Sequence, residues 1–269
     1  MVLFQKNAGS GPARNNGLNN ANGEYIVFVD PDDWVAPTMV EELLKSMKEK
    51  DVDFVTSGCI TEIYSGDRFI NEIEDGFPEQ IILSSENLGK SYFGLFNIGA
   101  ISAPTKKIYK RSIIDRNNIE FPDLRRSQDI VFNYRYYQHI ESVYVSPNAY
   151  YYYRVDMKAN QGKIKLSYYK SIAFIFKDIK NLCLLWEIDP NDVEYQKFCL
   201  HFFVALELVL RLHNDKQSIA EVVGNEYIQQ LVDEVQVNTT KYKILKSMIK
   251  NKHAIAISIG MKLMCLKSN

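Results

Sequence analysis

Residues 23–34 read Gly-Glu-Tyr-Ile-Val-Phe-Val-Asp-Pro-Asp-Asp-Trp, a short apolar run followed at once by an acidic turn. The residues from Tyr25 to Val29 are apolar and β-prone, and turn residues bound them on both sides, so the run predicts a buried strand. Such a strand needs neighbouring strands and cover on both faces. The stretch therefore predicts the interior of an α/β sheet.

The residues that follow continue an α/β pattern. Between residues 38 and 48 the apolar side chains recur near helical spacing, at Met39, Leu43, Leu44 and Met47. Residues 53–60 then return to a β-prone apolar run. This β-α-β order favours a parallel or mixed sheet.

The remaining patterns divide the chain into two parts. We expect an α/β domain over residues 1–160 and a helical region over residues 161–269. In the first part the patterns predict a polar hairpin at 61–82, a helix from Ser84 to Phe96, a strand at 106–109, a helix at 112–116, a helix capped by Ser127 that reaches His139, and strands at 142–145 and 150–154.

The acidic turn is the first candidate site. Asp30, Asp32 and Asp33 follow the predicted strand, at the end where open α/β sheets bind their ligands. Pro31 stiffens the turn, so we expect the carboxylates to converge, and carboxylates suit Mg²⁺ or Mn²⁺ that also binds substrate phosphates. The alternative is a solvated turn that caps the next helix, which the turn alone favours.

A longer motif surrounds this turn. Over about thirty consecutive residues the chain resembles family 2 glycosyltransferases of the GT-A fold, through Gln5-Lys6-Asn7-x-Gly9-x-x-x-Ala13-Arg14-Asn15-x-Gly17-Leu18-x-x-Ala21-x-Gly23-Glu24-Tyr25-Ile26-x-Phe28-Val29-Asp30-x-Asp32-Asp33. The likeness continues through residues 107–112, Phe121, residues 128–132 and residues 150–154, and so spans residues 3–167. The resemblance implies an α/β, partial GT-A (Rossmann-like) mixed sheet, followed here by a helical C-terminal region.

The resemblance also implies site residues. In the family the D-x-D carboxylates hold a divalent metal that bridges the nucleotide diphosphate, and this role falls to Asp30 and Asp32, with Asp33 nearby. The family's acidic pair ahead of an apolar helix appears as Gln128-Asp129, so Asp129 inherits the role of general base in a reaction that inverts the anomeric carbon. Gln128 replaces the usual Glu, which removes a negative charge and lowers the expected pKa of Asp129.

Other residues carry two interpretations each. Arg14 pairs with a phosphate of the donor or braces the loop before the strand. Arg154 and Lys107 face the diphosphate or the acceptor, although a solvated edge is the preferred position for Lys107. Trp34 contacts the donor sugar or packs on the next helix. In the run from Tyr150 to Tyr153 alternate rings lie on opposite faces, where core packing is favoured over stacking on a sugar.

Composition excludes several other classes of protein. The chain has 269 residues and is 46% hydrophobic. Its formal net charge is −1, so no overall positive charge favours binding to nucleic acid. Its four cysteines and four histidines show no metal-ligand spacing. We expect no secretory signal and no membrane-spanning helix, and hence a cytoplasmic protein. A lipid-linked acceptor would bring this protein to the inner face of the cell membrane.

The C-terminal end is basic and partly apolar. No Asp or Glu follows residue 241, whereas the segment contains Lys241, Lys243, Lys246, Lys250, Lys252, Lys262 and Lys267. This segment either lies peripherally on an anionic membrane surface, near a lipid-linked acceptor, or is an ordinary packed helix with a solvated face. The sequence alone leaves both interpretations open.

Two hypotheses for function follow. The first is an inverting glycosyltransferase of bacterial surface polysaccharide synthesis, which uses a nucleotide-sugar donor, UDP by default, and a glycan or polyprenyl-linked acceptor. Family members normally begin with two strand-helix units that recognise the base and ribose, and the motif near Asn7 is not preceded by them. The second hypothesis is therefore a truncated, inactive remnant or interaction protein, whose exposed sheet surface favours oligomers.

Overall fold

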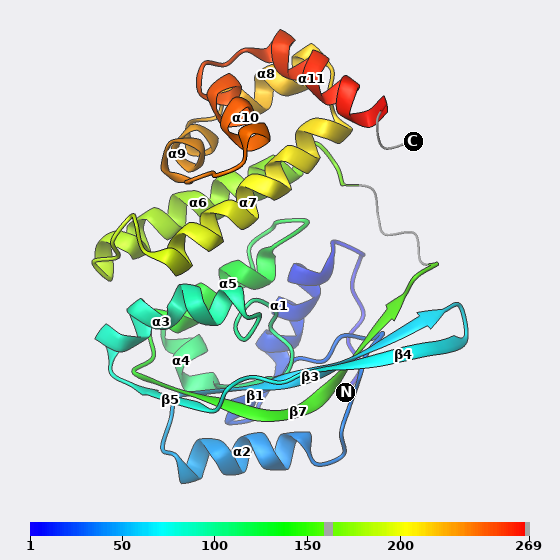
Figure 1. Ribbon diagram of the computed structural model, residues 1–269. Helices are drawn as coiled ribbons and strands as arrows, with labels where there is room; N and C mark the ends of the chain where they lie inside the picture. The colour runs from blue at the N-terminus through cyan, green and yellow to red at the C-terminus, as the bar shows by residue number, and fades with distance from the viewer. Residues whose placement is uncertain (159–163, 267–269) are drawn as a thin grey trace. The chain divides into compact units, whose positions relative to one another are not determined.

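The computed structural model describes residues 1–158 and 164–266, which form two compact units, Met1–Gln161 and Gly162–Asn269. Each unit is described on its own. Within the described residues the first unit is built on a seven-stranded sheet (Figure 1). Its strands are β1 Tyr25–Ile26, β2 Trp34–Val35, β3 Phe54–Ser65, β4 Arg68–Asp75, β5 Gln80–Leu83, β6 Lys107–Lys110 and β7 Ser142–Asp156.

The sheet is mixed, as the sequence predicted. Its strand order is β1-β6-β3-β7-β2, and β4 and β5 pair with β3 and β7 at the sides. The two long strands β3 and β7 run parallel, while the other pairs are antiparallel. The predicted hairpin is formed by β3 and β4, and the two strands predicted at 142–145 and 150–154 are one continuous strand, β7.

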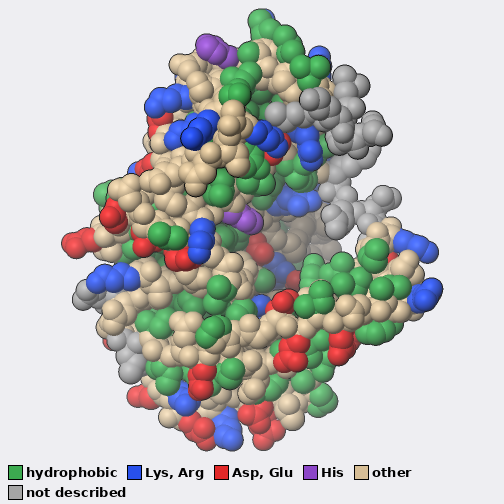
Figure 2. Space-filling model, in the orientation of Figure 1, with side chains coloured by type: hydrophobic (Ala, Val, Ile, Leu, Met, Phe, Trp, Pro, Cys, Tyr) green, Lys and Arg blue, Asp and Glu red, His purple; other side chains and the backbone are tan. Residues whose placement is uncertain are grey.

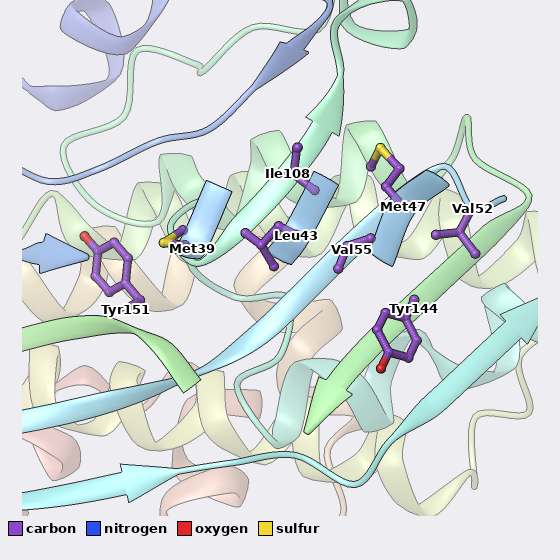
Figure 3. Close-up of a cluster of buried hydrophobic side chains, with 8 residues drawn as sticks. All are labelled: Met39, Leu43, Met47, Val52, Val55, Ile108, Tyr144 and Tyr151. Atoms are coloured by element: carbon purple, nitrogen blue, oxygen red, sulfur yellow. The ribbon is translucent and has the colours of Figure 1, made fainter. Parts of the chain in front are cut away.

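Helices cover both faces of the sheet. On one face lies α2 (Met39–Glu49), and on the other lie α3 (Ser85–Asn97) and α5 (Gln128–Tyr137) (Figure 1). Met39, Leu43 and Met47 lie one turn apart on α2 and are fully or almost fully buried, because this stripe faces Val55 and Ile108 of the sheet (Figure 3). The helix that the spacing of these apolar residues predicted is therefore confirmed as α2.

The opposite face holds an aromatic core. The ring of Phe28 makes edge-to-face contacts with Tyr109, Phe121 and Phe132, at centroid distances of 5.7, 5.3 and 5.5 Å. Phe121 and Phe132 are stacked at 4.1 Å. These rings fix the chain that leads into the acidic turn, because Phe28 lies two residues before Asp30.

The strand predicted at residues 25–29 is shorter than expected. Only Tyr25 and Ile26 pair as β1, with Lys110 and Tyr109 of β6, and Val29 is 49% exposed. Phe28 adds a single parallel bridge to Thr105. The expectation of a fully buried strand was wrong because, among the described residues, β1 has a strand neighbour on one side only.

One element was not predicted, and one local prediction needs correction. Residues 10–20 form helix α1 (Ser10–Asn20), which the many Gly and Asn residues concealed. Ser127 precedes α5 but does not cap it through its side chain, because its backbone is left-handed, with φ of 61°. The helix at 112–116 is present as α4 (Arg111–Arg116).

The second unit is helical, as predicted. Its helices are α6 Tyr168–Leu185, α7 Val193–Leu212, α8 Lys216–Gly224, α9 Glu226–Glu234, α10 Thr240–Lys250 and α11 Ala254–Leu266. Asp192, Asp215, Asn225 and Thr239 cap α7 to α10 through their side chains. Among residues 1–158 and 164–266, no helix is both long and apolar enough to cross a membrane.

Candidate active site

Arg14 and Asp30 form the centre of the site. The guanidinium of Arg14, on α1, lies 2.5 Å from Oδ1 of Asp30, and it also lies over the Phe121 ring at 5.4 Å. The next residue, Asn15, exchanges two hydrogen bonds with the backbone of Phe121, at 2.8 and 2.9 Å. Helix α1 is therefore held at the acidic turn by side chains of the predicted motif.

Asp33 is engaged on the other side of the turn. Its Oδ2 accepts a hydrogen bond from the hydroxyl of Tyr151 at 2.6 Å, and its Oδ1 accepts one from the backbone N–H of Arg154 at 3.0 Å. The same hydroxyl accepts from the N–H of Asp30 at 3.1 Å. Burial raises the pKa of Asp33, and the carboxylates of Asp32 and Asp30 add to this, while the two hydrogen bonds oppose it.

The expected convergence of three carboxylates is not found. In the described part of the chain no three His, Cys, Asp or Glu side chains form a group that could hold a metal ion. Both oxygens of Asp33 instead accept hydrogen bonds from β7. Asp32 is exposed, and no hydrogen bond or ion pair from the described residues engages its carboxylate. In Asp30, Oδ1 accepts the hydrogen bond from Arg14, and Oδ2 has no hydrogen-bond partner within the described residues.

Asp129 is the second residue of α5 and is partly buried. Its burial and the charges of Arg14 and Asp30 all affect its pKa. Burial raises its pKa, and this effect outweighs the N–H groups of the first turn, at Ile130 and at Asp129 itself, which lower it. The Arg14 guanidinium also lowers the pKa of Asp129, and the Asp30 carboxylate raises it. The structure thus brings Asp129, Arg14 and Asp30 close enough to affect one another.

Gln128 is buried against the start of α1. Its Nε2 donates to Oγ of Ser10 at 2.5 Å, while its Oε1 is buried without a hydrogen-bond partner among the described residues. Gly11 allows this packing, because a Cβ there would lie 3.2 Å from the carbonyl oxygen of Pro122. Next to these residues is a cavity of about 590 Å³, lined by Asn7, Ala8, Gly9, Ser10, Asp123, Leu124 and Arg125.

Lys107 does not lie on a solvated edge, so that prediction was wrong. Its side chain is fully buried, and its Nζ donates to the carbonyl oxygen of Thr105 at 3.2 Å. The physical reason is that β6 is an internal strand between β1 and β3. Burial lowers the pKa of Lys107 well below its ordinary value, and the positive charge of Lys106 contributes in the same direction.

Trp34 and Arg154 lie beside the turn on paired strands. The Trp34 ring stacks on Tyr152 at 5.9 Å, with an angle of 15° between the planes. The guanidinium of Arg154 lies 4.6 Å over the ring of Tyr64, so the backbone of Arg154, rather than its charge, engages the acidic turn. The sequence identified both residues but did not predict these contacts.

Tyr151 belongs to the candidate site, and the sequence analysis did not identify it as such. The alternation in the tyrosine run placed one set of rings in the core, and Tyr151 is indeed buried. What the pattern could not show is that its hydroxyl joins Asp30 to Asp33. A run of four tyrosines opposite an acidic turn is the signal that could have suggested this contact.

Comparisons with known proteins agree with the motifs. Residues 1–118 match the model of glycosyl transferase family 2. Glycosyltransferase GlyG of Streptococcus pneumoniae is 29% identical over 194 residues, which is 71% of this chain and 64% of that protein. The poly(ribitol-phosphate) beta-glucosyltransferase of Bacillus spizizenii is 28% identical over 148 residues, 55% of this chain and 21% of that protein.

The fold is also shared with a solved structure. Residues 1–349 of TarS from Staphylococcus aureus, in complex with UDP-GlcNAc, align with a TM-score of 0.59 and 17% identity, over 98% of this chain and 74% of that one. The predicted GT-A-like fold and the resemblance to family 2 glycosyltransferases are confirmed. The chain spans 64% of the length of GlyG.

Proposed function

Residues 1–118 belong to glycosyl transferase family 2, and from this premise we propose that the chain transfers a sugar from a nucleotide-diphosphate donor to an acceptor hydroxyl with inversion. UDP is the proposed nucleotide, which the solved TarS complexes with UDP and UDP-GlcNAc support by fold similarity. The proposed acceptor is a glycan or polyprenyl-linked glycan of a bacterial surface polysaccharide. The proposed location is the cytoplasmic face of the cell membrane.

The observation that carries the proposal is the grouping of Arg14, Asp30 and Asp129. Three segments distant in sequence, α1, the acidic turn and the start of α5, contribute one cation and two carboxylates to one region. A carboxylate whose pKa is raised by burial, beside an ion pair, is typical of functional sites. The grouping therefore favours catalysis over a purely structural role.

Asp129 is the proposed general base. An acceptor hydroxyl must lose its proton as its oxygen attacks the anomeric carbon, and a positioned carboxylate can accept that proton. Burial raises the pKa of Asp129, which makes its carboxylate a stronger base than an exposed one. Gln128, which precedes Asp129, is a proposed contact of the donor or acceptor, and its Oε1 is buried without a hydrogen-bond partner among the described residues.

Asp30 and Asp32 are the proposed ligands of Mn²⁺ or Mg²⁺. They fit a site that the substrate completes, because such a metal commonly takes one or two carboxylates together with substrate phosphates. Asp32 is exposed, and Oδ2 of Asp30 accepts no hydrogen bond from the described residues. When bound, the metal would offset the charge that grows on the departing diphosphate. Arg14 is the proposed cation for the same phosphates, and Asp33 positions the turn.

Calorimetric titration of the full chain with UDP, with and without Mn²⁺, tests the proposal. We expect binding that depends on Mn²⁺ and that Asp32→Ala weakens by at least tenfold. Asp67→Ala is the matched control, because Asp67 is an exposed carboxylate on the β3–β4 hairpin, away from the acidic turn. Equal binding by Asp32→Ala and Asp67→Ala would refute the metal assignment.

The alternative function is an inactive remnant or an interaction protein. It would be favoured if the folded chain bound no UDP at any metal concentration. A circular dichroism melt on the same sample establishes that the chain is folded. The three-residue grouping argues against this alternative, and transfer of label from UDP-sugars to polyprenyl-linked acceptors then distinguishes an active enzyme from a donor-binding remnant.

A further inference from the structure

Helix α11 exposes apolar side chains on the side that faces away from its own unit. Ile255, Ile259 and Leu263 are 59%, 56% and 56% exposed, and their spacing of four residues places them along one side of the helix. The opposite side is packed into the unit through Ile257 and Met261, each 1% exposed. We call the three exposed residues the α11 stripe.

The stripe is more than scattered surface hydrophobicity. Single exposed aliphatic residues are normal on soluble proteins, whereas aligned ones on one helix face mark a contact surface. The space-filling view shows hydrophobic side chains gathered over α11, at the top (Figure 2). Packing of α11 through Ile257 and Met261 already anchors the helix, so the stripe is not needed to hold it in place.

The chain segment that contains the stripe carries charges of one sign, although Asp215, at the start of the neighbouring helix α8, is acidic. No Asp or Glu occurs from residue 235 to residue 269. Some of the lysines in this segment are neutralised by the rest of the unit, since Lys241 pairs with Glu207 at 2.8 Å and Lys250 with Asp233 at 2.7 Å.

Other lysines retain an uncompensated charge close to the stripe. Lys252 lies two residues before α11, and Lys262 lies within it, beside Leu263. Both are exposed, and within residues 1–158 and 164–266 neither forms an ion pair. Three aliphatic side chains flanked by free cations match the chemistry of an anionic bilayer, in which acyl chains lie beneath negative headgroups.

We propose that the α11 stripe docks this chain on an anionic lipid surface, with α11 lying in the plane of the interface. A second copy of the chain is a poorer occupant, because a stable interface buries about 800 Å² on each partner and three half-exposed aliphatic side chains provide far less. Like charges on two copies of this segment would also repel each other. The inference goes beyond the proposed transfer reaction and does not depend on it.

Cosedimentation of the full chain with vesicles tests the inference. The vesicles contain either phosphatidylcholine alone or equal parts of phosphatidylglycerol and phosphatidylcholine. We expect binding to the anionic vesicles only. The triple variant Ile255→Ser, Ile259→Ser, Leu263→Ser should lose at least tenfold in partitioning, and the double variant Lys252→Gln, Lys262→Gln roughly fivefold for each lysine removed.

A matched control uses exposed leucines elsewhere in the same unit. Leu184 and Leu185, at the end of α6, are 77% and 66% exposed, and Leu184→Ser, Leu185→Ser should bind vesicles like the parent chain. Circular dichroism melts establish that all variants fold. Titration with UDP and Mn²⁺ on the same samples should give equal affinities, so that failure of the donor site and failure of the lipid surface are distinguishable.

Three outcomes would overturn the inference. One is equal vesicle binding by the stripe variant and the parent chain, and another is no binding by the folded parent chain. The third is a parent chain that is dimeric by light scattering without lipid, together with a monomeric stripe variant. That third result would assign the stripe to a second copy of the chain instead.

Discussion

At Asp129 the stability of the fold conflicts with the proposed chemistry, because burial raises the pKa of a carboxyl group that must be ionised to act as a base. An unfolded Asp has a pKa of about 3.9. Since the folded pKa is higher, ionisation disfavours the folded state. This destabilisation is absent below the unfolded pKa and complete above the folded pKa.

The variant Asp129→Asn should therefore be more stable than the parent chain at neutral pH. This difference should shrink as the pH falls through the raised folded pKa and disappear below about 4. Transfer activity should fall by about 10²- to 10⁴-fold, because the general base is lost. Urea unfolding at pH 7 and pH 3, with Asp67→Asn as the control, measures the first effect. A variant that is less stable than the parent chain at pH 7 would contradict the assignment of the raised pKa.

Tyr151 gives a second prediction at the residue scale. The variant Tyr151→Phe removes the hydroxyl that joins the N–H of Asp30 to Oδ2 of Asp33, and leaves both without that partner. We expect a loss of about 1–3 kcal/mol in the free energy of unfolding. We also expect weaker Mn²⁺-dependent UDP binding, because the acidic turn is less constrained. Tyr150→Phe is the control, since the Tyr150 hydroxyl accepts a hydrogen bond from Nδ2 of Asn148 at 3.0 Å, and equal effects of both variants would contradict the role of Tyr151.

The sequence selected candidate residues that the structure brings together, but it did not predict their contacts. Residue type and motif spacing selected Arg14, Asp30 and Asp129, which lie in one electrostatic environment. Alternation along a strand placed Tyr151 in the core but could not show which group its hydroxyl meets. Lys107 was assigned to an edge because charged residues are rarely buried, whereas strand order, which local sequence does not determine, places it inside the sheet.

At the scale of elements, Asp53 connects three strands. Its Oδ1 accepts from Nζ of Lys110 at 2.7 Å, at the end of β6, and its Oδ2 accepts from the N–H of Glu141 at 2.9 Å and the hydroxyl of Ser142 at 3.3 Å, where β7 begins. Burial alone would raise the pKa of Asp53, but the Lys110 ammonium and the other donors outweigh it and lower the pKa. The ionised carboxylate therefore stabilises the fold.

Because the folded pKa of Asp53 is depressed, its contribution is present above the unfolded pKa of about 3.9 and is lost as the pH falls through the folded pKa. Asp53→Asn should lower the free energy of unfolding by about 1–3 kcal/mol at pH 7, and by less at pH 3. Urea unfolding at both values measures this. Asp51→Asn is the control, because Asp51 is exposed and Asn tolerates its positive φ of 49°.

Local sequence patterns predicted those helices and strands whose own residues have a high propensity for that structure. The apolar stripe of α2 identified that helix, because its buried residues recur at helical spacing. Helix α1 has the opposite character, since Gly and Asn disfavour helix, and it is held by the Asn15–Phe121 and Arg14–Asp30 contacts instead. The length of β1 likewise depends on which strands flank it, which short-range sequence cannot specify.

At the scale of the whole molecule, the two units carry separate proposed tasks. The donor residues lie in the unit Met1–Gln161, and the α11 stripe lies in the unit Gly162–Asn269. If the units act independently, anionic vesicles should leave the affinity for UDP and Mn²⁺ unchanged. Titration with and without vesicles measures this, and a large change in affinity would mean that the lipid surface and the donor site are coupled.

Transfer to a lipid-linked acceptor should nevertheless require both units. Docking on the bilayer raises the local concentration of enzyme at an acceptor embedded there, as a tether does for a second binding event. The stripe variant should therefore lose activity on a polyprenyl-linked acceptor in anionic vesicles. The loss should match its loss of partitioning into the vesicles, at least tenfold. Its affinity for the donor should stay equal to that of the parent chain. Transfer of labelled sugar from the nucleotide donor to the same acceptor in vesicles is followed for the parent chain, the stripe variant and the Leu184→Ser, Leu185→Ser control. Full activity in a stripe variant that no longer binds vesicles would mean that the acceptor reaches the enzyme without membrane docking, and the acceptor would then be a water-soluble glycan.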